Sequence, residues 1–114
     1  MAASADLSEQ SILDLVHLAR QTFDDRVLGR ELVALLEQQC LHLLPVMRGA
    51  PRAERSDAAH TLKGAARAVG AWRLARVAER LEDALEGRAG EALPGIMGDL
   101  ERAVRETRDA AARL

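Results

Sequence analysis

The chain has 114 residues and a net charge of −2, and 48% of its residues are hydrophobic but only 2% are aromatic. This length supports a single domain over residues 1–114, and the scarcity of aromatic residues favours helices over sheet. The charge leaves no basic excess for nucleic acid, and no apolar run reaches the ~20 residues of a membrane span or follows a signal-peptide pattern, so we expect a cytoplasmic protein.

The chain is expected to begin with one short helix. Residues 1–7 are expected to be frayed, and Ser8 is a candidate N-cap for a helix that ends near Gln21. The apolar residues at helical spacing in this stretch are Ile12, Leu15, Val16 and Ala19. We expect this short helix to cover one end of a helical bundle.

The second expected helix runs from about Asp25 to Arg48, and either Asp24 or Asp25 can cap it. Its rhythm of i, i+4, i+7 is carried by Leu28, Leu32, Leu35, Leu36, Gln39, Leu43, Val46 and Met47. Pro45 should bend or end the helix near its last turn, because proline lacks a backbone N–H. The lone cysteine, Cys40, lies among apolar neighbours and is expected to be buried.

Three further helices are expected. The third begins near Arg52 or Ala53 and ends at Gly70, where a left-handed residue should close it, and the fourth stops near Gly87. The last runs from about Glu91 to Arg113 with a proline in its first turn. Four longer amphipathic helices with short connections predict an all-α fold: an antiparallel up-and-down four-helix bundle with an additional short N-terminal helix.

The third helix carries a polar stripe. At about 100° per residue, His60, Lys63, Gly64 and Arg67 fall on one narrow line, and Ser56 joins it one turn earlier. A separate apolar seam lies roughly 130° away and consists of Ala59, Leu62, Ala66 and Val69. We therefore expect His60 in solvent, with a cation one turn on and a residue without a side chain beside it. Lys63 is the only lysine among 16 basic residues.

Helix geometry adds a carboxylate to this stripe. Glu82 lies about as far beyond the turn at Gly70 as His60 lies before it, and both helices rise ~1.5 Å per residue, so the two residues should be level. Glu79 shares the face of Glu82 one turn away. A carboxylate that accepts a hydrogen bond from Nδ1 would leave Nε2 as the nucleophile. Both glutamates can instead form ordinary ion pairs with Arg76 or Arg80.

The run His60-Thr61-Leu62-Lys63-Gly64-Ala65-Ala66, closed by Gly70, resembles the signature of the histidine-containing phosphotransfer (HPt) family. The resemblance continues through Leu74 and the Leu81-Glu82 pair. In relatives, a Glu or Gln at the position of Glu82 plays a similar orienting role. The resemblance implies that phosphate arrives on His60 from a receiver-domain aspartate, leaves to another response regulator, and involves a hybrid histidine kinase. Any Mg²⁺ for the transfer would be held by the receiver.

The stripe has the chemistry that such a transfer needs. A neutral, exposed imidazole presents a nitrogen lone pair that can attack an activated phosphoryl group. Lys63 can offset charge on the phosphoryl oxygens, Gly64 leaves room for a partner surface, and Arg67 can extend the positive rim. The sequence contains no nucleotide-binding loop, so we expect a phosphotransfer intermediate without an ATP site or a cofactor of its own.

Two other functions stay open at this point. A passive helical adaptor would dock partner helices while His60 does nothing chemical. The dimerising phosphoacceptor region of a sensor histidine kinase would also present a histidine on a helix. Such regions are similar to one another in placing an acidic residue directly after the histidine, whereas Thr61 follows it here. We expect a monomer, since an obligate dimer would favour the kinase interpretation.

Overall fold

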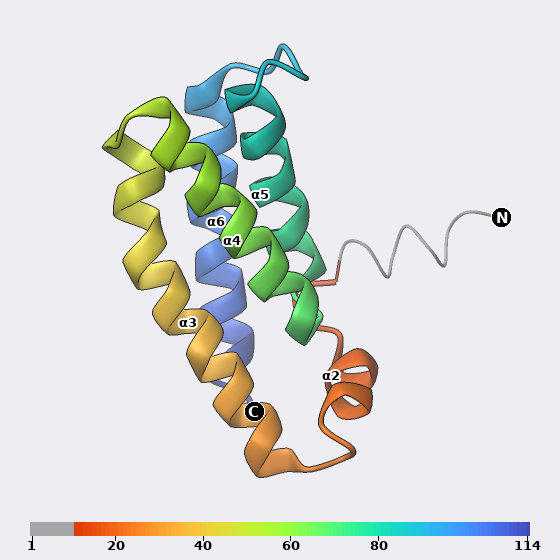
Figure 1. The fold of residues 1–114 in the computed structure, drawn as a ribbon. Coiled ribbons are helices and arrows are strands. Elements are labelled where there is room, and N and C mark those ends of the chain that lie inside the picture. Colours follow the sequence, from red (N-terminus) through yellow and green to blue (C-terminus); the bar gives the residue numbers. More distant parts are fainter. Residues whose placement is uncertain (1–10) are drawn as a thin grey trace, which may run out of the picture.

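The computed structural model describes residues 11–114, and this part of the chain is all-helical, as predicted. Its helices are α2 (Leu15–Gln21), α3 (Arg26–Gly49), α4 (Arg52–Val69), α5 (Trp72–Leu85) and α6 (Leu93–Ala111) (Figure 1). The predicted fraying of residues 1–7 and the candidate cap Ser8 lie outside the described residues. No helix within residues 11–114 is both long enough and apolar enough to cross a membrane.

The first helix begins later than predicted. Residues 11–14 are not helical, and α2 starts at Leu15 with Asp14 as its N-cap, whose Oδ1 accepts the His17 N–H at 3.0 Å. The reason is tertiary, because the Asp14 N–H donates to the Gly70 carbonyl at 2.9 Å and the Ser11 carbonyl accepts the Arg73 N–H at 3.0 Å. These bonds hold residues 11–14 against the turn between α4 and α5, so the prediction that Ile12 is helical is wrong.

The second helix follows its prediction closely. Asp25 is the N-cap of α3, with its Oδ1 accepting the Leu28 N–H at 3.1 Å, and the helix continues through Pro45 to Gly49. Cys40 is buried at 2% exposure, as predicted. The apolar periodicity predicted a wider buried face than the structure has, since Leu28 is 37% exposed and Leu35 is 55% exposed. Periodicity alone places both leucines at the edge of the apolar stripe, where a neighbouring helix decides their burial.

The remaining helix ends agree with the glycine and proline signals. Gly70 closes α4 in the left-handed conformation with φ of 83°, as predicted. The helix α5 ends two residues before Gly87, which also has a positive φ of 77°. The helix α6 begins at Leu93 with the proline in its first turn. The predicted boundaries were therefore within two residues of the observed ones at these positions.

The core is built from small and branched aliphatic side chains. The predicted seam of α4 is buried, with Ala59, Leu62 and Ala66 at 0% exposure and Val69 at 4%. Contacts join α3 to α4, α4 to α5, α5 to α6, and α6 back to α3, while α2 touches α3 and α4 at one end of the bundle (Figure 1). This packing leaves the opposite face of α4 in solvent, and His60 lies on that face.

Candidate functional site

His60 lies on the outer face of α4, as the helical stripe predicted. Its side chain is 68% exposed, while the seam on the opposite face of the same helix is buried. Gly64 lies one turn further on and is exposed, and a Cβ placed there would meet nothing within 4 Å. The packing of this chain therefore does not require a glycine at that position, although glycine in a helix interior costs about 1 kcal/mol relative to alanine.

A buried carboxylate from α5 holds the imidazole. Glu82 Oε2 lies 2.8 Å from His60 Nδ1, and the Glu82 side chain is only 8% exposed. Because an ionised carboxylate only accepts hydrogen bonds, the ring hydrogen in this contact belongs to Nδ1. The other ring nitrogen, Nε2, then carries the lone pair. The prediction that Glu82 lies level with His60 across the turn at Gly70 is therefore confirmed.

Lys63 binds the second oxygen of the same carboxylate. Its Nζ lies 2.6 Å from Glu82 Oε1, and its side chain is 15% exposed. Burial raises the pKa of Glu82, but the hydrogen bonds from Lys63 and His60 outweigh burial and leave the pKa below its ordinary value. Glu82 is therefore an anion at neutral pH. One of its oxygens binds His60 and the other binds Lys63. The sequence placed Lys63 near His60 without indicating that Glu82 is its partner.

The outer residues of the stripe are arranged differently. Arg67 Nη2 lies 2.7 Å from Glu79 Oε2, and these side chains are 50% and 41% exposed. Arg67 is thus tied across to α5 rather than extending freely as a rim beside His60. Ser56 is half-buried one turn before His60. The structure brings His60, Lys63 and Glu82 into direct contact and leaves Arg67 and Glu79 as a separate exposed pair.

The alternative in which Glu79 and Glu82 pair with Arg76 or Arg80 does not describe Glu82. Arg80 instead binds Asp99 at 3.0 Å and also Glu91, so it links α5 to α6 and to the segment before α6. Among residues 11–114, no group of three or more His, Cys, Asp or Glu side chains is arranged to hold a metal ion. The imidazole of His60 is therefore oriented by the carboxylate of Glu82, and the ammonium of Lys63 binds the same carboxylate.

Sequence reasoning missed one contact network near the site. Trp72 Nε1 donates to Asp14 Oδ2 at 2.9 Å, and the Trp72 and His17 rings meet edge to face with centroids 4.8 Å apart. From the sequence, Trp72 is simply a core or core-edge residue. No local pattern links residues that are 58 positions apart. This network fastens α2 to the turn that sets the register of α4 against α5.

Comparison with known protein families matches residues 27–112 of the chain to the Hpt domain. The comparisons with curated proteins and with solved structures gave no significant match. The matched range runs from the second residue of α3 to just past the end of α6 and includes His60, Lys63 and Glu82. Because this match spans most of the chain, the chain belongs to the Hpt domain family, the histidine phosphotransfer carriers of phosphorelays.

Proposed function

We propose that His60 accepts a phosphoryl group from the aspartyl phosphate of a receiver domain and passes it to the aspartate of another response regulator. The observation that carries this proposal is the 2.8 Å contact between His60 Nδ1 and a buried, ionised Glu82, which leaves Nε2 as the nucleophile on a side chain that is 68% exposed. The Nε2 lone pair attacks phosphorus, the bond between phosphorus and the aspartyl oxygen breaks, and the aspartate leaves as a carboxylate. The reverse sequence on a second receiver removes the group.

Glu82 stabilises the charge that develops during this step. When Nε2 bonds to phosphorus, the ring becomes cationic, and the Nδ1–H then points at a carboxylate 2.8 Å away. Lys63 is an ammonium one turn from His60 that can offset negative charge on the phosphoryl oxygens, since its Nζ already lies at the edge of the site on Glu82. Gly64 provides clearance for the receiver surface. Ser56, Arg67 and Glu79 form the surrounding contact surface.

The remaining parts of the proposal concern the whole chain. We take residues 1–114 as one domain and α3 to α6 as an antiparallel up-and-down four-helix bundle, which the ring of contacts and the alternating chain directions in Figure 1 support. The protein acts as a cytoplasmic, monomeric carrier between a hybrid histidine kinase and response regulators, without an ATP site or cofactor of its own. Mg²⁺ for the transfer belongs to the receiver.

The test is transfer from a phosphorylated receiver to the chain. We expect a label that is acid-labile and base-stable, which identifies a phosphoramidate, and its loss in His60→Gln with helicity unchanged. The matched control is His42→Gln, because His42 is another exposed histidine, on α3, and should keep full labelling. Labelling that survives in His60→Gln would remove His60 from the mechanism. An obligate dimer in solution would favour a sensor-kinase phosphoacceptor region instead.

A further inference from the structure

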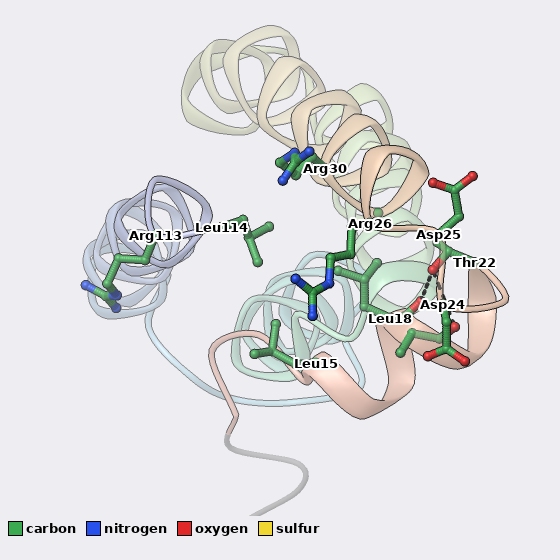
Figure 2. Close-up of a pocket in the computed structure, with 11 residues that line it drawn as sticks. Leu15, Leu18, Thr22, Asp24, Asp25, Arg26, Arg30, Arg113 and Leu114 are labelled. Atoms are coloured by element: carbon green, nitrogen blue, oxygen red, sulfur yellow. Dashed lines mark hydrogen bonds between the residues drawn. The ribbon is translucent and has the colours of Figure 1, made fainter.

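A hollow lies at the far end of the bundle from the α5–α6 connection, where α2, the start of α3 and residues 113–114 meet. It has a volume of about 570 Å³ and is walled by residues from three separate segments: α2 with its following turn, the first turns of α3, and residues 113–114 (Figure 2). This volume falls within the range of about 300–1,000 Å³ that is typical of small-molecule sites. None of the residues placed in phosphotransfer lines it.

One wall of this cavity is apolar although it faces water. Leu15 is 58% exposed and Leu114 is 39% exposed, while Leu18 beside them is buried at 6%. The Thr22 hydroxyl, which also lines the cavity, donates to the Leu18 carbonyl at 2.9 Å. The leucines therefore form an apolar surface that a hydrocarbon chain can cover, with a gain of roughly 25 cal/mol for each Å² removed from water.

Three arginines and two aspartates line the cavity, so its side chains carry a formal excess of one positive charge. Arg26, Arg30 and Arg113 line it, and within residues 11–114 their guanidinium groups form no ion pair or hydrogen bond. Figure 2 shows the Arg26 guanidinium between Leu15, Leu18 and Leu114 in this view, and the carboxylates of Asp24 and Asp25 on the side away from Leu15 and Leu114. Asp25 is engaged as the N-cap of α3.

Six other arginines of the bundle are paired, whereas Arg20, Arg105 and Arg108 also form no ion pair within residues 11–114. Arg48, Arg67, Arg73, Arg80, Arg88 and Arg102 each bind a carboxylate of the chain. Guanidinium groups bind carboxylates and phosphates with charge-assisted hydrogen bonds, and those around this cavity have their donors free. An apolar wall beside free guanidinium groups is complementary to a molecule that is anionic at one end and apolar at the other.

We propose that this cavity binds a small amphiphilic anion, a carboxylate or phosphate carrying an apolar chain. The head group binds Arg26 and Arg30, and the chain covers the exposed side chains of Leu15 and Leu114. This proposal does not depend on the chemistry of His60, because the two sites share no residue. Binding here involves α2 directly, and α2 is bonded to the α4–α5 turn through Asp14.

The test uses octanoate as the probe, followed by amide shifts in NMR spectra of the full chain. We expect saturable binding with a Kd on the order of 10 mM, the affinity typical of a ligand with about ten heavy atoms. The shifts should be confined to α2, the first turns of α3 and residues 113–114. Octanol and acetate each lack one half of the ligand and should bind at least about tenfold more weakly. Equal binding of octanol, or binding only to anionic lipid vesicles, would overturn the proposal.

Charge variants test whether octanoate binds to this cavity or is attracted to any exposed arginine. Replacing both arginines, Arg26→Gln with Arg30→Gln, should weaken octanoate binding by about tenfold, whereas Arg105→Gln should not, because Arg105 is exposed on α6 away from the cavity.

A plug variant tests the volume itself. A Cβ at Gly29 would lie 3.6 Å from Leu18 Cδ2, which is ordinary contact, so Gly29→Ala fits and should keep binding. The longer side chain of Gly29→Leu would press on Leu18, which lines the cavity, and should abolish binding. Each variant is first checked for unchanged helicity and thermal unfolding. Retained binding in Gly29→Leu, or equal loss in Arg105→Gln, contradicts the proposed site.

Discussion

The α4–α5 pair and the α2 end of the bundle use their carboxylates in different ways. Glu82, on α5, is 8% exposed and binds two side chains, one of which is the exposed imidazole of His60. At the α2 end, Asp14 and Asp25 each accept a backbone N–H and so fix where a helix begins. The first arrangement positions an exposed imidazole, whereas the second fixes the start of each helix and, through Asp14, also binds the indole of Trp72. The exposed imidazole of His60 is therefore held by a carboxylate, Glu82, that is itself buried.

Gly70 joins the two regions, and its replacement should have the largest effect on stability. Its φ is 83°, and a Cβ there would lie 3.0 Å from both Cβ and the carbonyl oxygen of Asp14. We expect Gly70→Val to lower the free energy of unfolding by about 3 kcal/mol, since left-handed strain and overpacking each cost about 1–3 kcal/mol. Denaturant unfolding measures this loss.

Gly64 is the matched control for Gly70. Its surroundings are open and it lies inside α4, so Gly64→Ala should raise the free energy of unfolding by roughly 0.5–1 kcal/mol. If its role is clearance for a receiver, the same substitution should slow phosphotransfer while it stabilises the fold. A Gly70→Val variant as stable as the parent would contradict the close approach of the two regions.

Removing Glu82 tests the side-chain arrangement. Glu82→Leu leaves Lys63 without its partner, and we expect a loss of about 2 kcal/mol in the free energy of unfolding at pH 7, because the ammonium is only 15% exposed. Phosphotransfer to His60 should also slow, since the ring loses its orienting contact. Unchanged transfer in a folded Glu82→Leu protein would separate Glu82 from the chemistry.

The pH dependence of that loss follows from the lowered pKa of Glu82. A carboxyl with a pKa lower in the folded than in the unfolded state contributes stability that is fully present above the unfolded value, about 4.3 for glutamate. This contribution is lost as pH falls through the lower, folded pKa. The stability difference between the parent and Glu82→Leu should therefore be constant near pH 7 and shrink below about pH 4.

These two regions also differ in what the sequence could predict. The stripe on α4, the seam behind it and the level of Glu82 follow from helix geometry about a single short turn, and the family resemblance rests on the same residues. The start of α2 depends on bonds from residues 11–14 to Gly70 and Arg73, about sixty positions away, which leave no local signal. The binding of Lys63 to Glu82 likewise depends on side-chain conformations that residue spacing does not fix.

Asp14 gives the corresponding test at the α2 end. Asp14→Ala removes the N-cap of α2 and the partner of Trp72 Nε1, and we expect a loss of about 1–2 kcal/mol in the free energy of unfolding. Trp72 is the only tryptophan, so its fluorescence should report the change directly. Labelling of His60 should persist. Loss of labelling in this folded variant would show that the two regions are more tightly coupled than their contacts indicate.

The exposed pair should matter least. Arg67 and Glu79 are both more than a third exposed, and a pair of this kind contributes about 0–1 kcal/mol. Glu79→Ala should therefore change the free energy of unfolding by no more than about 0.5 kcal/mol, in contrast to Glu82→Leu. Unfolding at low and high salt checks this. An effect of Glu79→Ala as large as that of Glu82→Leu would remove the distinction between buried and exposed carboxylates.

The most direct test of the central claim is the position of the phosphoryl group on the His60 ring. The contact between Nδ1 and Glu82 requires that phosphorus bonds to Nε2 while Nδ1 keeps its hydrogen. Nitrogen NMR of the chain phosphorylated by a receiver can assign both ring nitrogens. We predict phosphorus coupling at Nε2 and a protonated Nδ1, whereas phosphorus on Nδ1, or on any other residue, would contradict the account.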